Sequence, residues 1–229
     1  MGPVGMKKLA AEFFGTFALV FAGTGAIVIN DVSNGAVTHV GIALTFGLVV
    51  LALIYALGEV SGAHFNPAVT FGFWAAGRLP VKLVPSYVAS QCLGALLASF
   101  LMRLLFPVHD TLGATHPAGS VVQSLVLEIV LTWFLMLVIL SVSTGAKEKG
   151  ITAGIAVGAV IALEALFAGP ITGASMNPAR SLAPAIVSAR LGQLWIYLVA
   201  PVLGASLAVF ACRCVQEKDC CPATTKSAA

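Results

Sequence analysis

Two copies of the tripeptide Asn-Pro-Ala are the most informative residues of this sequence. The copies are Asn66-Pro67-Ala68 and Asn177-Pro178-Ala179, and they lie 111 residues apart. Asparagine is a good helix N-cap and proline a good first helical residue, so each copy predicts the start of a helix. The free N–H groups and the positive dipole end of such a helix face the segment that precedes it. These groups could donate hydrogen bonds to an oxygen atom and repel a cation.

Each copy starts a short apolar run, from Asn66 to Ala76 and from Asn177 to Ser188. A run of about ten residues cannot cross a bilayer core of roughly 30 Å. We therefore predict two re-entrant half-helices that meet, N-terminus to N-terminus, at mid-membrane. Irregular backbone at that depth is tolerated only where it is buried in protein or lines a water-filled path.

This geometry predicts a pore between the two half-helices. Asn66 and Asn177 would each donate an amide N–H to a permeating oxygen, while the opposed helix dipoles repel protons and cations. Backbone carbonyls before each helix would supply a line of acceptors, so that neutral solutes pass with little desolvation cost. The carbonyls belong to Gly62, Ala63 and His64 in the first half and to Gly173, Ala174 and Ser175 in the second. The alternative is that the two motifs only cap buried helices.

The composition is that of an integral membrane protein. Of the 229 residues, 59% are hydrophobic and 9% are charged, and the mean hydropathy is +1.01. The net charge of +3 comes from basic residues scattered at the ends of apolar runs, so no nucleic-acid partner is expected. The four histidines show no spacing typical of a catalytic or metal site. We therefore expect no enzyme activity, no bound metal and no cofactor.

Six long apolar runs predict six transmembrane helices. The runs extend from Leu9 to Asn30, His39 to Gly58, Lys82 to Phe106, Val121 to Ser143, Ile151 to Gly169 and Gln193 to Cys212. Together with the two half-helices they predict an all-α membrane protein with a single transmembrane domain over residues 1–229. Residues 222–229, which are polar or small, are expected to form a disordered tail.

The two halves of the sequence are repeats of each other, over about residues 7–107 and 121–214. The matching segments are Glu12-x-x-x-Thr16 with Glu128-x-x-x-Thr132, Gly41-Ile42-Ala43 with Gly154-Ile155-Ala156, and Leu93-Gly94-Ala95 with Leu203-Gly204-Ala205. Each half holds three spans, an odd number, so the halves must have opposite topologies. They are therefore related by a pseudo-two-fold axis in the membrane plane. The small residues that would allow close helix approach, within a protomer or between protomers, are Gly94, Ala98, Gly204 and Ala208.

Basic residues set the expected orientation in the bilayer. One side would carry Lys7, Lys8, Arg78, Lys82, Lys147, Lys149, Arg213, Lys218 and Lys226. The other side would carry Arg103 and Arg190. By the positive-inside rule we expect both termini in the cytoplasm, and we expect a plasma-membrane location.

With these motifs the chain resembles the aquaporins, which form the major intrinsic protein family, over about residues 7–214. The shared features are both Asn-Pro-Ala copies, Arg180 after the second copy, and the glutamates of the first and fourth spans. Residues 54–66 and 167–177 are most similar to the nodulin-like intrinsic protein branch, whereas Ser181 stands where glycerol facilitators usually carry Asp. The resemblance implies a homotetramer with one pore per protomer.

The resemblance also implies which residues form the narrowest ring of the pore. They would be Phe46, Ala165, Ala174 and Arg180, although helical periodicity alone would make Phe46 a lipid-facing or helix-facing residue. Water-selective members usually have a histidine at the position of Ala165. A ring with two alanines should therefore be wider and admit glycerol, urea and metalloid acids such as arsenite or boric acid, as well as water. The alternatives are a strict water channel and an ion-coupled secondary transporter, which would also have inverted repeats and broken helices.

Carboxylates inside a membrane are costly and therefore indicate a role. The resemblance implies that Glu12 and Glu128 accept hydrogen bonds from the backbone of the re-entrant loops and brace them. Glu59, near one mouth of the pore, would act as a loop anchor or as a gate. Glu164 adjoins Ala165 and either faces the lumen or packs behind the second loop.

Overall fold

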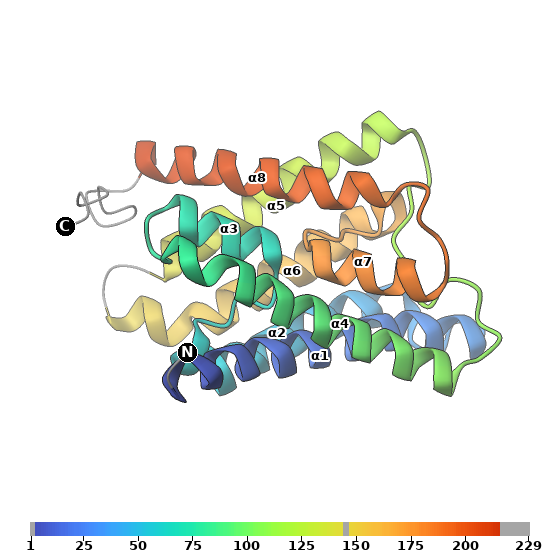
Figure 1. The fold of residues 1–229 in the computed structure, drawn as a ribbon. Helices are drawn as coiled ribbons and strands as arrows, with labels where there is room; N and C mark the ends of the chain where they lie inside the picture. The colour runs from blue at the N-terminus through green and yellow to red at the C-terminus, as the bar shows by residue number, and fades with distance from the viewer. Residues whose placement is uncertain (1–2, 144–146, 216–229) are drawn as a thin grey trace.

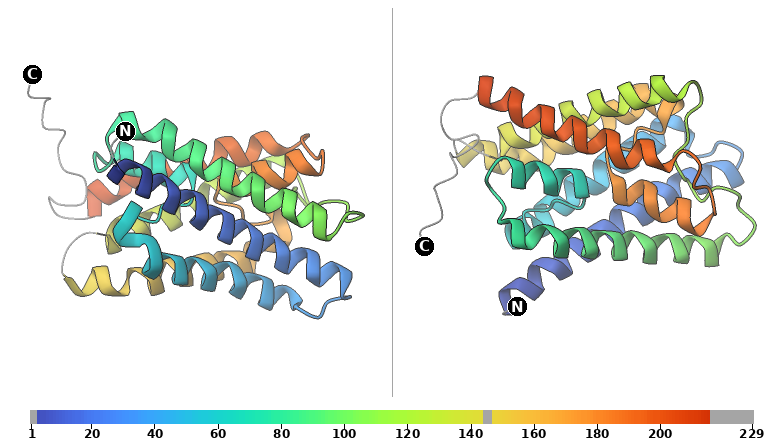
Figure 2. Two further views of the ribbon diagram at one scale, coloured as in Figure 1. Left: turned by 60° about the horizontal axis from the view of Figure 1, so that its bottom comes forward. Right: turned by 45° about the horizontal axis from the view of Figure 1, so that its top comes forward.

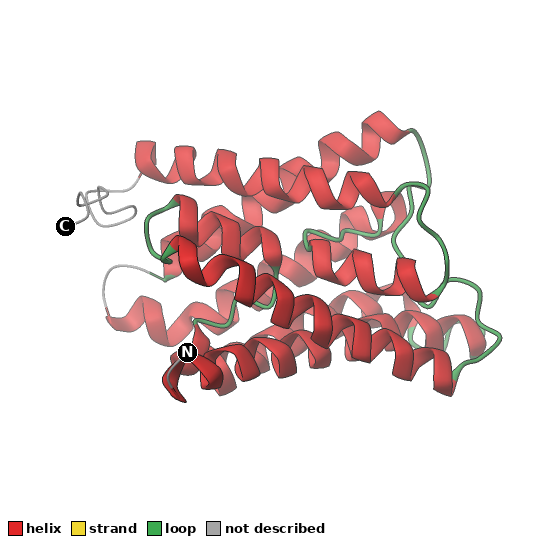
Figure 3. Ribbon diagram, in the orientation of Figure 1, coloured by secondary structure: helices red, strands yellow, loops and turns green. Residues whose placement is uncertain are grey.

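The computed structural model describes residues 3–143 and 147–215, and within these ranges it is helical and contains no strand (Figure 3). The elements are α1 (Pro3–Val32), α2 (Thr38–Ser61), α3 (Pro67–Ala75), the 3-10 helix η1 (Val81–Leu83), α4 (Val84–Leu105), α5 (Val121–Val142), α6 (Lys147–Thr172), α7 (Pro178–Val187) and α8 (Leu194–Val215). The prediction of a disordered tail over residues 222–229 lies outside the described residues.

Six helices of the described chain, namely α1, α2, α4, α5, α6 and α8, are long and apolar enough to cross a membrane. This confirms the six predicted spans, although the helices extend beyond the apolar runs. The helix α6 continues through Pro170 to Thr172, where the sequence predicted an end at Gly169. Proline lacks an N–H and so leaves the carbonyl of Leu166, four residues earlier, without its helical donor. The Nε2 atom of His39 binds that carbonyl oxygen at 2.7 Å, so the helix can continue.

The helices pack as two equivalent halves. The helix α1 packs along α4 as α5 packs along α8, α1 contacts α2 as α5 contacts α6, and α2 and α6 pack against each other. In Figure 1 the half-helices α3 and α7 leave the middle of the bundle in opposite directions. Figure 2 shows the two half-helices between α4 and α8, and α4 and α8 each contact both of them. The start of α1 and the end of α8 lie at the same end of the bundle (Figure 1).

Glycine residues set the closest helix approaches within this protomer. A Cβ atom added to Gly94 in α4 would overlap the carbonyl oxygen of Phe13 in α1, and one added to Gly204 in α8 would overlap that of Ile129 in α5. Gly47 and Gly158 approach each other in the same way, because a Cβ on either would lie 2.5 to 2.7 Å from the carbonyl oxygen of the other. The predicted small residues therefore bring helices together inside the protomer.

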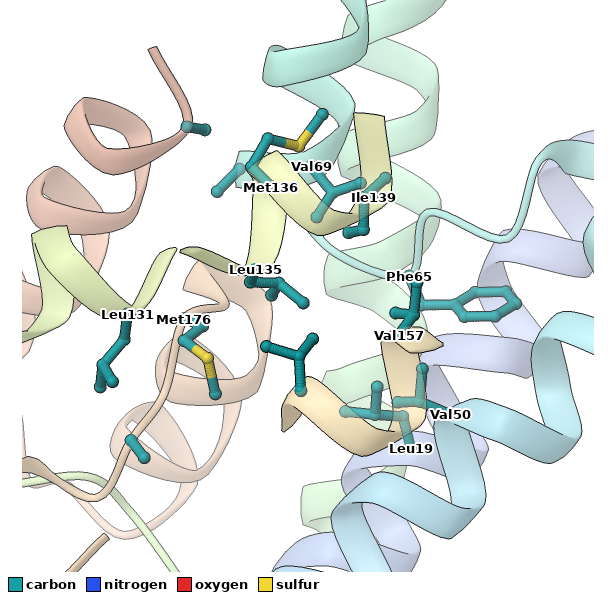
Figure 4. Close-up of a cluster of buried hydrophobic side chains, with 14 of the residues drawn as sticks. Leu19, Val50, Phe65, Val69, Leu131, Leu135, Met136, Ile139, Val157 and Met176 are labelled. Atoms are coloured by element: carbon teal, nitrogen blue, oxygen red, sulfur yellow. The ribbon is translucent and has the colours of Figure 1, made fainter. Parts of the chain in front are cut away.

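The core also anchors the loop before α3. Phe65 is 1% exposed, and a Cβ on Gly15 in α1 would overlap its ring. Figure 4 shows Leu19, Val50 and Val157 gathered near Phe65. These three residues come from α1, α2 and α6. Spanning helices therefore pack directly against the loop that starts the first half-helix.

Gly204→Val should destabilise the protein, because the added methyl groups must displace the α5 backbone. We expect a free energy cost of about 1–3 kcal/mol or more, as for other overpacked sites. Thermal unfolding in detergent would measure the loss as a lower midpoint. Gly192→Val is the control, since a Cβ at Gly192 meets no atom within 4 Å. Equal midpoints for the two variants would contradict the close approach of α5 and α8.

Candidate functional site

The two Asn-Pro-Ala motifs start α3 and α7, and their asparagines meet at the centre of the protein. The side-chain oxygen of Asn66 accepts from Ala68 N at 2.8 Å, and that of Asn177 accepts from Ala179 N at 3.0 Å and Arg180 N at 3.3 Å. Each asparagine is thus the N-cap of its own half-helix. The prolines and alanines of the motifs form the first turns of the half-helices.

Each asparagine also binds the loop of the opposite half. Asn66 Nδ2 donates to the carbonyl oxygen of Met176 at 2.7 Å, and Asn177 Nδ2 donates to that of Phe65 at 2.9 Å. A carboxamide nitrogen carries two hydrogens, so each asparagine retains a second donor. Both asparagines line the central cavity. The two half-helices are therefore joined by a reciprocal pair of hydrogen bonds, and a donor remains on each side of it.

The loops before the half-helices have the same unusual backbone. Ala63 and Phe65 have φ of 51° and 50°, and the equivalent Ala174 and Met176 have φ of 41° and 53°. Left-handed φ values cost residues with a side chain roughly 1–2 kcal/mol each. The surrounding structure must therefore hold both loops in place.

Two buried carboxylates provide that support. Glu12 accepts from the backbone N–H groups of His64 and Phe65 at 3.0 and 2.7 Å. Glu128 accepts from those of Ser175 and Met176 at 2.8 and 2.9 Å. Hydroxyl groups add a further bond to each carboxylate, from Ser61 at 2.7 Å and from Thr172 at 2.8 Å. Both glutamates are fully buried, so these charge-assisted bonds form away from water.

Other supporting residues were not identified from the sequence. Tyr87 OH donates to the carbonyl oxygen of Ser61 at 2.9 Å, and Tyr197 OH donates to that of Thr172 at 2.7 Å. The two tyrosines lie 110 residues apart, which is the offset of the repeat, so the internal comparison could have found them. Gln91 Nε2 donates to Glu12 at 2.7 Å and to Thr70 Oγ1 at 2.8 Å. In the second half proline occupies the position equivalent to Gln91.

A cavity runs past the meeting point of the half-helices. Its polar lining includes His64, Asn66, Ser175, Asn177 and Arg180. Its apolar lining includes Leu19, Val50, Val69, Leu135, Ile139, Val157 and Ile161. Ala63 also lines this cavity, whereas Gly62 does not. Gly173 lines the wider space at one end, which we call the vestibule and which is also lined by Asn30, His39, Thr115 and His116.

Four residues line both the central cavity and the vestibule, and so lie where the two spaces join. They are Phe46, Ala165, Ala174 and Arg180, which we call the junction ring. Phe46 therefore faces the interior, although periodicity alone favoured a lipid-facing or helix-facing position. The guanidinium carbon of Arg180 lies 5.0 Å from the centroid of the Phe46 ring, within the range of a cation–π contact.

The α4–α5 loop (residues 106–120) holds the charged member of the ring. Arg180 Nη1 donates to the carbonyl oxygen of Gly113 at 2.8 Å. Thr115 Oγ1 donates to Ser181 Oγ at 2.8 Å, and Ser181 lies 2.5 Å from Ser175 Oγ. This loop is not part of the repeat, and no pattern in the sequence indicated its contacts with α7.

The remaining intramembrane carboxylates lie outside the cavity lining. Glu164 is fully buried, within electrostatic range of Glu128, and neither of its oxygens has a hydrogen-bond partner in the described chain. Glu59 is exposed at the end of α2. Among the described residues no group of three or more His, Cys, Asp or Glu side chains could hold a metal ion.

Comparison with known proteins identifies the class of this fold and site. Residues 3–212 match the family model described as major intrinsic protein. The structure resembles the X-ray structure of the aquaglyceroporin from Plasmodium falciparum with a TM-score of 0.84 and 26% identity, over 92% of this chain and 96% of that one. The fold and the opposed half-helices are those of a membrane channel.

Sequence relatives give the same result. The chain is 52% identical over 201 residues to aquaporin NIP1-1 of Zea mays, covering 87% of this chain and 71% of the relative. It is 46% identical over 225 residues to nodulin-26 of Glycine max, covering 97% and 83%. The chain belongs to the major intrinsic protein family, whose members are channels and not enzymes. The predicted resemblance to the nodulin-like branch is confirmed.

Glu128→Gln should destabilise the second loop. A carboxamide of the same shape has only one acceptor oxygen, so its NH₂ group must face the backbone N–H of Ser175 or of Met176. Leaving a buried donor unsatisfied costs about 1–3 kcal/mol. Thermal unfolding in detergent should therefore show a lower midpoint. The control is Glu59→Gln, which changes an exposed carboxylate, and a shift of equal size in both variants would show that Glu128 does not hold the loop.

Proposed function

We propose that this protein is a passive channel for water and small neutral solutes, including glycerol, urea and metalloid acids such as arsenite or boric acid. The junction ring supports this proposal most directly. Two of its four members are alanines, which leave space beside the Phe46 ring and the guanidinium of Arg180. The arginine offers hydrogen-bond donors to a hydroxyl or amide oxygen, and the phenyl face suits the carbon side of an amphipathic solute. We assign the junction ring as the selectivity filter.

The Asn-Pro-Ala motifs form the second functional element of this proposal. The amide donors of Asn66 and Asn177 replace part of the hydration of a passing oxygen, and the loop carbonyls accept its hydrogens. The positive ends of α3 and α7 and the charge of Arg180 repel protons and cations. Glu12 and Glu128 brace the loops that carry these groups.

Two alternatives differ in what crosses the membrane. A strict water channel would need a narrower ring, and the small side chains of Ala165 and Ala174 argue against one. An ion-coupled transporter would need ligands for the coupling ion, and two opposed helix N-termini disfavour a cation at the centre.

We further propose that the protein acts in the plasma membrane as a homotetramer with both termini in the cytoplasm. The distribution of basic residues supports this orientation. Arg78 and Arg213 follow α3 and lie at the end of α8, whereas Arg103 and Arg190 belong to the opposite end of the bundle. The vestibule then opens to the outside.

Ala165→His should reduce glycerol and arsenite flux much more than water flux. The imidazole would occupy the space beside Phe46 and add a hydrogen-bonding group, which narrows the ring. Stopped-flow flux of each solute through matched amounts of reconstituted protein measures the effect. Loss of one well-fitted contact or gain of one clash corresponds to about 1–3 kcal/mol, so a tenfold change in the glycerol-to-water ratio is expected.

The matched control for this substitution is Ala118→His, because Ala118 lines the vestibule without belonging to the junction ring. Ala162, one turn earlier in α6, is unsuitable because its Cβ lies 2.7 Å from where a Cβ on Gly47 would stand. Equal losses of water and glycerol flux in Ala165→His would place the selectivity filter elsewhere.

Arg180→Val should allow protons or cations to cross. A unit charge about 6 Å from a permeating cation contributes roughly 3 kcal/mol of repulsion at an effective dielectric constant of 20. Its removal should raise proton flux under a membrane potential by about tenfold or more. A pH-sensitive dye inside proteoliposomes records this flux. Arg190→Val removes an exposed arginine as the control, and unchanged proton flux in Arg180→Val would mean that Arg180 is not part of the barrier.

A further inference from the structure

The two ring nitrogens of His109, in the α4–α5 loop, have different partners. Nδ1 accepts a hydrogen bond from the backbone N–H of Leu112 at 3.1 Å. Because Nδ1 accepts, the hydrogen-bond network assigns the ring proton to Nε2. Nε2 faces Oδ2 of Asp31, at the end of α1, at 3.3 Å. The structure thus holds a neutral imidazole between the end of α1 and a turn of the loop.

The turn that His109 supports leads directly to the anchor of Arg180. Leu112 is fully buried against Val28 and Met102 and has φ of 51°. The next residue, Gly113, has φ of 72°, and its carbonyl oxygen accepts from Arg180 Nη1 at 2.8 Å. Two consecutive left-handed residues therefore separate His109 from the junction ring, and the bond to Leu112 N helps to hold the first of them.

We propose that His109 is a proton-sensitive positioning residue that controls Arg180 and closes the pore at acid pH. This inference rests on the proposed channel function. Histidine changes charge between about pH 5 and pH 8. A proton on Nδ1 would face the N–H of Leu112, so a hydrogen bond would be replaced by two opposed donors. The turn then relaxes, the carbonyl of Gly113 moves away, and the released guanidinium of Arg180 enters the junction.

The charged groups around His109 act in the same direction. Asp31 on α1 attracts the imidazolium, and its side chain is 52% exposed. The ring is therefore drawn toward α1 and away from Leu112 when it gains a proton. Arg103 on α4 donates from Nη1 to the carbonyl oxygens of Pro107 and His109, which holds the start of the loop, and its charge opposes protonation. Asp110, the next residue of the loop, is exposed.

Flux measurements on the full-length protein in proteoliposomes test the proposal. Water and glycerol flux are measured with the same pH on both sides, at about pH 7.5 and about pH 5.5, which bracket the titration of histidine. Equal pH on both sides makes the result independent of orientation. We expect flux at the lower pH to fall by about two- to tenfold, the factor that corresponds to the loss of one hydrogen bond.

Three variants separate a pH sensor from a structural residue. In His109→Asn the Oδ1 atom replaces Nδ1 as the acceptor for Leu112 N and cannot gain a proton, so flux should match the wild type at the higher pH and stay there at the lower pH. Asp31→Asn should keep the fall in flux but move its midpoint to lower pH. His116→Asn, which changes an exposed vestibule histidine, should behave as the wild type does.

The outcomes distinguish this inference from the channel proposal. Wild-type flux that is the same at both pH values, or a fall in flux that persists in His109→Asn, overturns the role of His109. An absence of solute flux in the wild type at the higher pH would instead contradict the proposed function.

Discussion

The reciprocal hydrogen bonds between Asn66 and Asn177 are the interaction on which the rest of the structure depends. Each asparagine caps its own half-helix and donates to the loop of the other half, so neither half-helix has a defined position without its partner. The donors can meet only if both loops adopt left-handed backbone, and that conformation persists because Glu12 and Glu128 bind the loop N–H groups. The glycine contacts between spanning helices fix where the two carboxylates lie.

A symmetric scaffold nevertheless builds an asymmetric pore. The repeat offset of 111 residues relates Phe46 and Arg180 to Val157 and Val69, and all four residues line the central cavity. The duplicated positions therefore carry an aromatic ring and a cation at one end and two aliphatic side chains at the other. A single charged ring is enough to select solutes, because every solute must pass it in series.

The α4–α5 loop connects the two halves and also breaks their symmetry. It anchors Arg180 through the carbonyl of Gly113 and contacts Ser181 through Thr115. Loops tolerate change better than helices, and functional residues are often carried by loops on a rigid scaffold. Here the scaffold fixes α7, and the loop determines how its arginine is presented to the pore.

The sequence by itself determined the six spans, the two half-helices and the inverted repeat, because apolar periodicity, helix caps and internal similarity are local or self-comparing signals. It did not reveal the tyrosine contacts, the burial of Glu164 or the anchor at Gly113. The inward direction of Phe46 could not be obtained from periodicity, since a helix in a membrane is apolar on all sides, and the ring positions came from family resemblance. Only the tertiary structure decided these features, because each depends on contacts between helices or loops distant in the chain, and their geometry is set by packing.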